Sequence, residues 1–136
     1  MAGVTFRLYT KEITQSIKDT ASARMYKAVN EVRNQINVTL SGKRTGRVYK
    51  VPGTNRTYTA SAPGQPPAVA TGELRQSIFT EVRGVGNQVT GRAGTRLPKG
   101  IWLDEGTKKM EARPWLERSL ERAIPRLREI FEESWL

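Results

Sequence analysis

The sequence predicts an α+β fold, in which a long N-terminal helix and a C-terminal helix pack on a small antiparallel β-sheet and a long, extended basic arm or hairpin stands out from the body. Three patterns lead to this prediction: apolar residues at helical spacing near both ends of the chain, short alternating segments typical of strands, and a central stretch dense in proline and glycine. A chain of 136 residues is the size of one domain. We therefore treat residues 1–136 as a single domain, with the arm at about 41–72.

The N-terminal third predicts a strand followed by a long helix. Val4, Phe6 and Leu8 alternate with polar residues, which is the pattern of a short, half-buried strand. Thr10 is a suitable helix cap, and Gly42 is a suitable stop. Between them, apolar residues recur every three or four positions and form one face of a helix. These residues are Ile13, Ile17, Ala21, Met25, Val29, Val32, Ile36 and Leu40.

The segment 41–72 cannot be helical, because it contains nine proline and glycine residues. Two pieces, 47–51 and 56–61, have strand-like composition and are separated by the turn sequence at 52–55. These pieces predict a hairpin or extended arm, which would reach roughly 50 Å if fully extended. The segment also holds five basic residues and no acidic one, so the arm carries a large share of the positive charge.

The second half of the chain predicts a hairpin and a final helix. Residues 73–77 form a short helical or extended turn, and the strands 78–83 and 88–93 are joined across 84–87. Residues 101–103 are a further apolar run, ended by Gly106, and Pro114 sits at the first position of a helix. Pro125 should kink this helix or divide it near Ala123. The expected apolar positions of the helix are Trp115, Leu116, Leu120, Ile124, Leu127, Phe131 and Trp135.

The composition excludes several kinds of chemistry. The chain has 23 basic and 13 acidic residues, a formal net charge of +10, and neither cysteine nor histidine. Disulfides, thiolate zinc sites and every nucleophile activated by histidine are therefore absent. No apolar run is long enough to cross a membrane, and residues 1–11 lack the features of a signal peptide. We expect a protein that is made in a cytosol and does not associate with a membrane.

No catalytic motif emerges from the remaining residues. Asp104 and Glu105 are the one acidic pair outside the expected helices, and Lys108 follows them, which resembles a minimal nuclease site. Adjacent residues on a strand point to opposite faces, so a metal-dependent nuclease is a weak alternative. Gly42 and Lys43 lack the other residues of a phosphate-binding loop. We expect no enzymatic activity, no metal and no cofactor.

Nucleic-acid binding is the stronger alternative. Tyr49 and Tyr58 lie among Arg47, Lys50 and Arg56, which could provide a surface for base stacking and phosphate contacts. The same tyrosines could instead be cross-strand partners that stiffen a hairpin, and the basic residues could form a solvated face. A sequence-independent nucleic-acid-binding module therefore remains open as the alternative function.

Three segments resemble one protein family in the expected order. Residues 61–68 (SAPGQPPA), followed by 71–74 (TGEL) and 77–78 (SI), look like the signature of neck and tail-completion proteins of tailed bacteriophages, also described as head–tail joining proteins or tail components. Residues 102–107 (WLDEGT) resemble the end of a strand in that family, and 112–116 (ARPWL) resemble the start of its final helix. With the long helix, the resemblance covers about residues 10–130.

The resemblance implies a non-enzymatic structural protein of the virion, made in the cytoplasm of a bacterial host. It implies a homo-oligomeric ring, with six copies as the expectation, that joins the head-closure or connector proteins to the tail-tube or tail-terminator proteins. DNA would pass through the ring and make non-specific contacts with it. The resemblance does not distinguish a tail terminator from a neck layer closer to the head.

We expect two groups of residues to act in assembly. The arm would contribute basic, aromatic and proline side chains, with the prolines holding its base in an extended form. These residues are Lys43, Arg44, Arg47, Tyr49, Lys50, Arg56, Tyr58, Pro63, Pro66 and Pro67. The second group is a strand–helix corner, where Arg113 would pair with an acidic residue. This group consists of Asp104, Glu105, Arg113 and Trp115.

Overall fold

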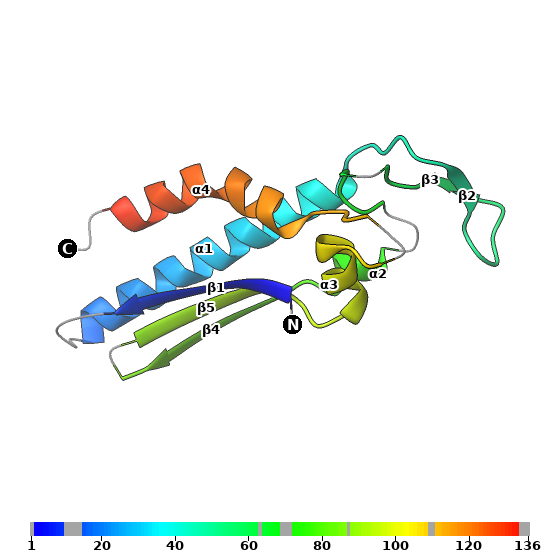
Figure 1. Cartoon of the computed structure of the whole chain (residues 1–136). Coiled ribbons are helices and arrows are strands. Elements are labelled where there is room, and N and C mark those ends of the chain that lie inside the picture. The colour runs from blue at the N-terminus through cyan, green and yellow to red at the C-terminus, as the bar shows by residue number, and fades with distance from the viewer. Residues whose placement is uncertain are drawn as a thin grey trace.

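A computed structural model of the chain describes residues 2–9, 15–62, 64–68, 72–86, 88–108 and 111–133. Its long helix, C-terminal helix and small antiparallel sheet confirm the α+β fold (Figure 1). The expected helix cap Thr10, the helical positions Ile13 and Trp135, and Pro63 of the arm lie outside the described residues. The elements in chain order are β1 (Ala2–Tyr9), α1 (Gln15–Ser41), β2 (Val48–Lys50), β3 (Thr57–Thr59), α2 (Glu73–Gln76), β4 (Phe79–Val85), β5 (Gln88–Thr95), α3 (Pro98–Glu105) and α4 (Leu116–Glu132).

The main sheet has three antiparallel strands in the order β1-β5-β4, so the last strand in sequence occupies the centre. The N-terminal strand and the 78–93 hairpin predicted from the sequence are both present, although β4 and β5 each continue two residues further than expected. In the register of the sheet, Gly91 lies between Phe6 of β1 and Val82 of β4. A separate two-stranded sheet, β2-β3, belongs to the arm.

Helix α1 packs on β4 and β5 on one face of the three-stranded sheet, and α4 lies alongside α1 (Figure 1). The apolar stripe predicted for α1 is the centre of the core, because its members from Ala21 to Leu40 are at most 2% exposed. The remaining core residues come from the sheet and α4, together with Leu74 of α2, Ile78 before β4 and Trp115 before α4. One side of α1 packs against both the sheet and α4, and this explains why its apolar residues recur at helical spacing.

The buried face of α4 differs from the prediction. Ser119, Ala123 and Ile130 are buried, whereas Ile124 is 38% exposed. Ser119 and Ala123 have small side chains, which let α4 approach α1 closely. The buried face of α4 is therefore shifted by one position from the apolar positions that the sequence predicted. Pro125 does not divide α4, which is helical from Leu116 to Glu132. Because Pro125 is exposed, the carbonyl group that it leaves without an intrahelical donor can be hydrated.

The apolar run at 101–103 belongs to a helix and not to a strand, so the expected strand–helix corner is a corner between α3 and α4. Pro98 starts α3 at a position where its missing N–H group costs nothing, and Gly106 ends the helix with a φ of +81°. A three-residue apolar run cannot distinguish helix from strand by its periodicity, and this explains the wrong prediction.

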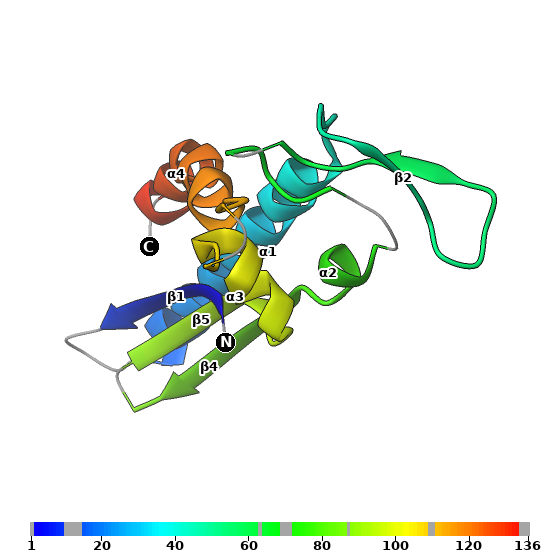
Figure 2. The same cartoon turned by 45° about the vertical axis from the view of Figure 1, so that its right-hand side comes forward.

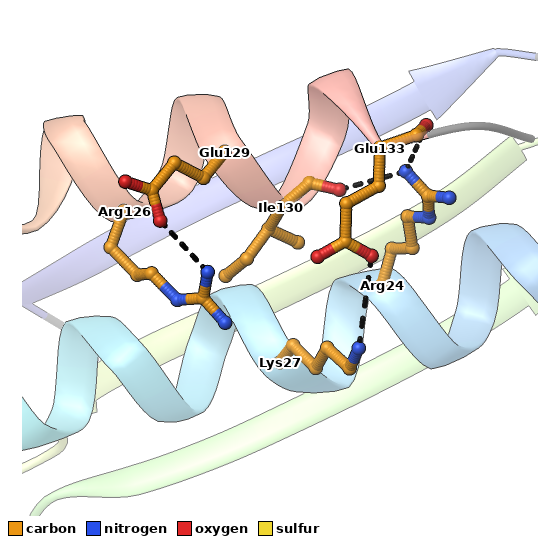
Figure 3. Close-up of polar contacts among 6 residues, drawn as sticks. All are labelled: Arg24, Lys27, Arg126, Glu129, Ile130 and Glu133. Carbon is orange, nitrogen blue, oxygen red and sulfur yellow. Dashed lines mark hydrogen bonds and ion pairs between the residues drawn. The ribbon is translucent and has the colours of Figure 1, made fainter.

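Polar contacts tie α4 to α1 at both ends. The Ser119 hydroxyl donates to Thr39 Oγ1 over 2.9 Å, and both residues are buried. At the other end, Arg24 is only 6% exposed and donates to the carbonyl oxygens of Ile130 and Glu133, at 2.8 and 2.6 Å (Figure 3). A buried guanidinium thus supplies donors and positive charge where the carbonyl groups of α4 lack intrahelical partners.

None of the described helices has the length and apolar character of a membrane span.

Candidate assembly site

The arm is a twisted hairpin that extends beyond the C-terminal end of α1, away from the main sheet (Figures 1 and 2). Strands β2 and β3 are short, but backbone hydrogen bonds on both sides of them continue the ladder from Gly46–Ala60 to Val51–Arg56. Tyr49 and Tyr58 are directly opposite each other in the register, with ring centroids 6.0 Å apart. The tyrosines are therefore cross-strand partners, and aromatic pairs of this kind stabilise isolated hairpins.

The basic residues of the arm divide into two classes. Lys43, Arg47, Lys50 and Arg56 are exposed along it, as expected for an interaction surface. Arg44 instead points into the base of the arm. Its guanidinium donates to the carbonyl oxygens of Thr39 and Pro66 at 2.6 Å and of Pro67 at 2.9 Å. Arg44 therefore joins the end of α1 to the returning strand of the arm.

Partial burial and, to a smaller extent, the positive charge of Arg118 lower the pKa of Arg44. An arginine stays charged despite such a shift, so its hydrogen bonds to carbonyl groups are charge-assisted. Arg44 was expected to act in assembly with the rest of the arm, and the structure shows that its guanidinium makes hydrogen bonds within the chain. The cost of placing this charge near Arg118 is offset by four carbonyl partners on two segments, those of Thr39, Lys43, Pro66 and Pro67.

A second contact at the base of the arm involves Gln65, which the sequence analysis did not single out. Its side-chain oxygen accepts from the backbone N–H groups of Thr45 and Ala62, at 3.1 and 2.9 Å. Its side-chain nitrogen donates to Thr45 Oγ1 over 2.9 Å. One amide group thus links both sides of the hairpin. Pro66 and Pro67, which were expected to stiffen the base, also provide the carbonyl acceptors for Arg44.

The segments that carry the family resemblance meet at this base. Arg113 donates through Nε to Ser61 Oγ over 2.9 Å and through its backbone N–H to the Leu103 carbonyl oxygen over 2.5 Å. The N–H of Gly64 donates to the Ala112 carbonyl oxygen over 3.3 Å. Hydrogen bonds therefore connect Ser61 and Gly64 with α3 and the segment that leads into α4, and we call this region the junction.

Asp104 caps α4 from a neighbouring helix. Its Oδ1 accepts from the backbone N–H groups of Trp115 and Leu116, at 3.0 and 3.1 Å. The expected ion pair between Arg113 and Asp104 or Glu105 is not formed, and that prediction is wrong. The first N–H groups of a helix need acceptors, and a carboxylate is especially favourable there, so Asp104 is already engaged. Glu105 is exposed.

Trp115 occupies the centre of the junction and is fully buried. Its Nε1 donates to the Gly100 carbonyl oxygen over 3.0 Å. A Cβ atom on Gly100 would lie 2.5 Å from Thr95 Cγ2 and 3.4 Å from Trp115 Cζ2, so only glycine fits. The indole thus fixes α3 against the start of α4 and the end of β5.

A groove of about 560 Å³ runs between the arm and the junction. Aromatic, basic and small apolar side chains line it, a composition suited to a protein segment with acidic groups. Among the described residues, no group of acidic side chains is arranged to hold a metal ion. The lining residues are Gly46, Arg47, Tyr49, Tyr58, Ala60, Ser61, Ala62, Pro67, Ala68, Leu103 and Arg113.

Replacing Asp104 with alanine should lower the free energy of unfolding by about 1–2 kcal/mol, because two backbone donors at the start of α4 lose their acceptor. Urea unfolding followed by circular dichroism measures the change. Glu105→Ala is the matched control, since this adjacent carboxylate is exposed, and its effect should stay within about 0.5 kcal/mol. Equal effects of the two substitutions would contradict the cap.

Several residues of the site could not be identified from the sequence. Gln65 and Ser61 contact Thr45 and Arg113, 20 and 52 residues away, and Leu103 accepts a hydrogen bond from the backbone 10 residues further on; all three lie within the quoted motifs, but no pattern in the sequence indicated these partners. Comparison with known proteins adds no further residue, because no family model, curated protein or solved structure matches the chain.

Proposed function

We propose that the chain is a structural subunit of a tailed-bacteriophage virion. Six copies form a ring at the neck or tail end that joins the head-closure complex to the tail tube and lets DNA pass. The observation that carries this proposal is the junction, where segments that resemble neck and tail-completion proteins hydrogen-bond to one another: Arg113 bonds to Ser61, 52 residues away, and the nearer Leu103 and Asp104 bond to Arg113 and Trp115. The protein is made in the bacterial cytoplasm and acts by contact, without catalysis.

A closed ring needs two different and complementary surfaces on each subunit. The arm is a suitable first surface, because residues 41–72 contain five basic residues and no acidic one. A suitable second surface lies on α4, where Glu117 and Glu121 are exposed one helical turn apart. Residues 101–136 have one more acidic than basic residue, whereas the rest of the chain is basic. Helix α4 itself has four glutamates and four arginines, so the proposed contact between the arm of one copy and α4 of the next depends on the pair Glu117 and Glu121 and not on a net charge of the helix.

The arm is expected to be necessary for assembly. Lys50→Glu combined with Arg56→Glu reverses two exposed charges of the arm and should weaken self-association at least tenfold, because like charges then face α4 of the neighbour. Light scattering at several protein concentrations measures the association. The charge-conserving pair Lys50→Arg and Arg56→Lys should assemble normally. If the reversed variant assembles as well as the unchanged protein, the arm is not part of the subunit interface.

A further inference from the structure

The outer face of the main sheet is the most distinct surface that the proposed function leaves without a role. Helices α1 and α4 lie on the opposite side of the sheet (Figure 1). Val89 and Ala93 of β5 are buried beneath α1, so the alternating residues Thr90 and Arg92 point away from the helices. The register places Arg7 of β1 opposite Thr90.

Basic side chains outnumber acidic side chains on this face. Arg7, Arg83 and Arg92 come from three adjacent strands, with Glu81 as the acidic neighbour. Arg83 pairs with Glu81 over 2.7 Å and still has a side chain that is 76% exposed. Arg96 contributes a further cation beside the same carboxylate, with an N–O distance of 4.0 Å. The four arginines and one glutamate leave a net charge of +3 on the face.

The geometry of the face is that of a rigid, shallow platform. The sheet hydrogen bonds fix the spacing of the arginines, and three strands span roughly 10 Å. A hollow of about 150 Å³ lies over β4 and β5 toward their hairpin end, lined by Glu81, Arg83, Val85, Gln88, Thr90 and Arg92. Among the described residues, Arg7 and Arg92 have no ion-pair partner, so their guanidinium groups are available to an external anion.

We propose that this outer face of the sheet binds the phosphodiester backbone of DNA without sequence preference. Arginine, threonine and glutamine side chains are typical phosphate and sugar contacts, and arginine can bind a phosphate group with two parallel hydrogen bonds. An acidic protein is a less suitable partner. Protein interfaces depend on buried aromatic or aliphatic anchors; Phe79 is already covered by Arg96, whose guanidinium carbon lies 4.0 Å from the ring centroid, and Val85, 75% exposed at the hairpin end, is the one large apolar side chain of this face that is exposed among the described residues.

The sheet is better preorganised for this role than the arm. Arg44, one of the five basic residues of the arm, is bound internally, and the others stand on a hairpin with three-residue strands. The two surfaces lie at opposite ends of the molecule, so they can be tested separately (Figures 1 and 2). The inference rests on the proposed function in one respect, which is that DNA passes through the ring. The binding measurement itself does not require a ring.

The experiment measures binding of a fluorescent DNA duplex of about 30 base pairs and mixed sequence over a range of salt concentrations. The double substitution Arg7→Gln and Arg92→Gln should raise Kd at least tenfold and reduce the slope of log K against log salt by about 2, because two phosphate contacts are lost. The matched control, Arg122→Gln with Arg128→Gln, removes the same charge from exposed positions on α4 and should change Kd less than about twofold.

Two further comparisons complete the test. Lys50→Gln with Arg56→Gln should leave most of the DNA affinity intact, and poly-glutamate should compete at least tenfold less well than unlabelled DNA. Equal losses in all three double variants, a loss confined to the arm variant, or equal competition by poly-glutamate would each overturn the inference. If the variant with Arg7→Gln and Arg92→Gln keeps its DNA affinity and the protein forms rings, this inference alone is refuted. If the unchanged protein binds DNA but never forms rings, the proposed function is refuted.

Discussion

Replacing Trp115 with alanine is expected to lower the free energy of unfolding by about 3–5 kcal/mol, the largest effect of any single substitution considered for this chain. The side chain is fully buried, and its removal leaves a cavity between α3, α4 and the end of β5. The Gly100 carbonyl group would also lose the indole N–H donor at 3.0 Å. Because the arm is held to the junction, its base should become accessible to proteases as well.

Urea unfolding and limited proteolysis measure these two effects. Trp102→Ala is the matched control, because this tryptophan belongs to the same junction but is 57% exposed. Its replacement should change the stability by no more than about 0.5 kcal/mol. Comparable destabilisation by both substitutions would contradict the assignment of Trp115 as the buried centre of the junction.

Replacing Gly91 with valine is expected to destabilise the protein by about 3 kcal/mol, at the upper end of the range for overpacked cores. Gly91 faces α1 from the central strand. A Cβ atom there would lie 2.6 Å from Met25 Cγ and 2.7 Å from Val29 Cγ1, so α1 would have to move away from the sheet. The valine methyl groups would extend this overlap further into the layer between helix and sheet.

Two additional variants make the Gly91 prediction specific. Gly84→Val is the matched control, because a Cβ atom at Gly84 meets only Lys18 Cε at 3.5 Å, and this variant should be nearly neutral. Met25→Ala removes the side chain that Gly91→Val would overlap, so combining the two should recover part of the lost stability. Thermal and urea unfolding provide both readouts, and additive losses in the double variant would contradict the packing argument.

The sequence predicted the parts of the fold that depend on local periodicity. The stripe from Ala21 to Leu40 follows from the spacing of apolar residues, and the strands of the main sheet follow from alternation and turn residues. The prediction of the buried face of α4 was less accurate, because Ser119 is buried and forms a hydrogen bond with Thr39 on another helix. No pattern within α4 contains that information.

The candidate site was harder to predict for the same reason. The sequence singled out Arg113, Asp104 and Arg44, but it gave Arg113 the wrong partner and Arg44 the wrong role. Asp104 meets the start of α4 only after Gly106 ends α3 and turns the chain back. Apart from the adjacent Lys43 carbonyl, the partners of Arg44 lie 5 to 23 residues away, across the base of the arm. Residue type indicates that an arginine needs acceptors, but tertiary structure decides which acceptors it finds.

We propose above all that this chain assembles into a ring at the neck or tail end of a virion. Electron microscopy of the purified protein, combined with labelling of the protein in intact virions, tests this claim most directly. We expect closed rings of six copies with the arms at the subunit boundaries, and label at the junction of head and tail. A protein that is strictly monomeric and absent from purified virions would contradict the claim.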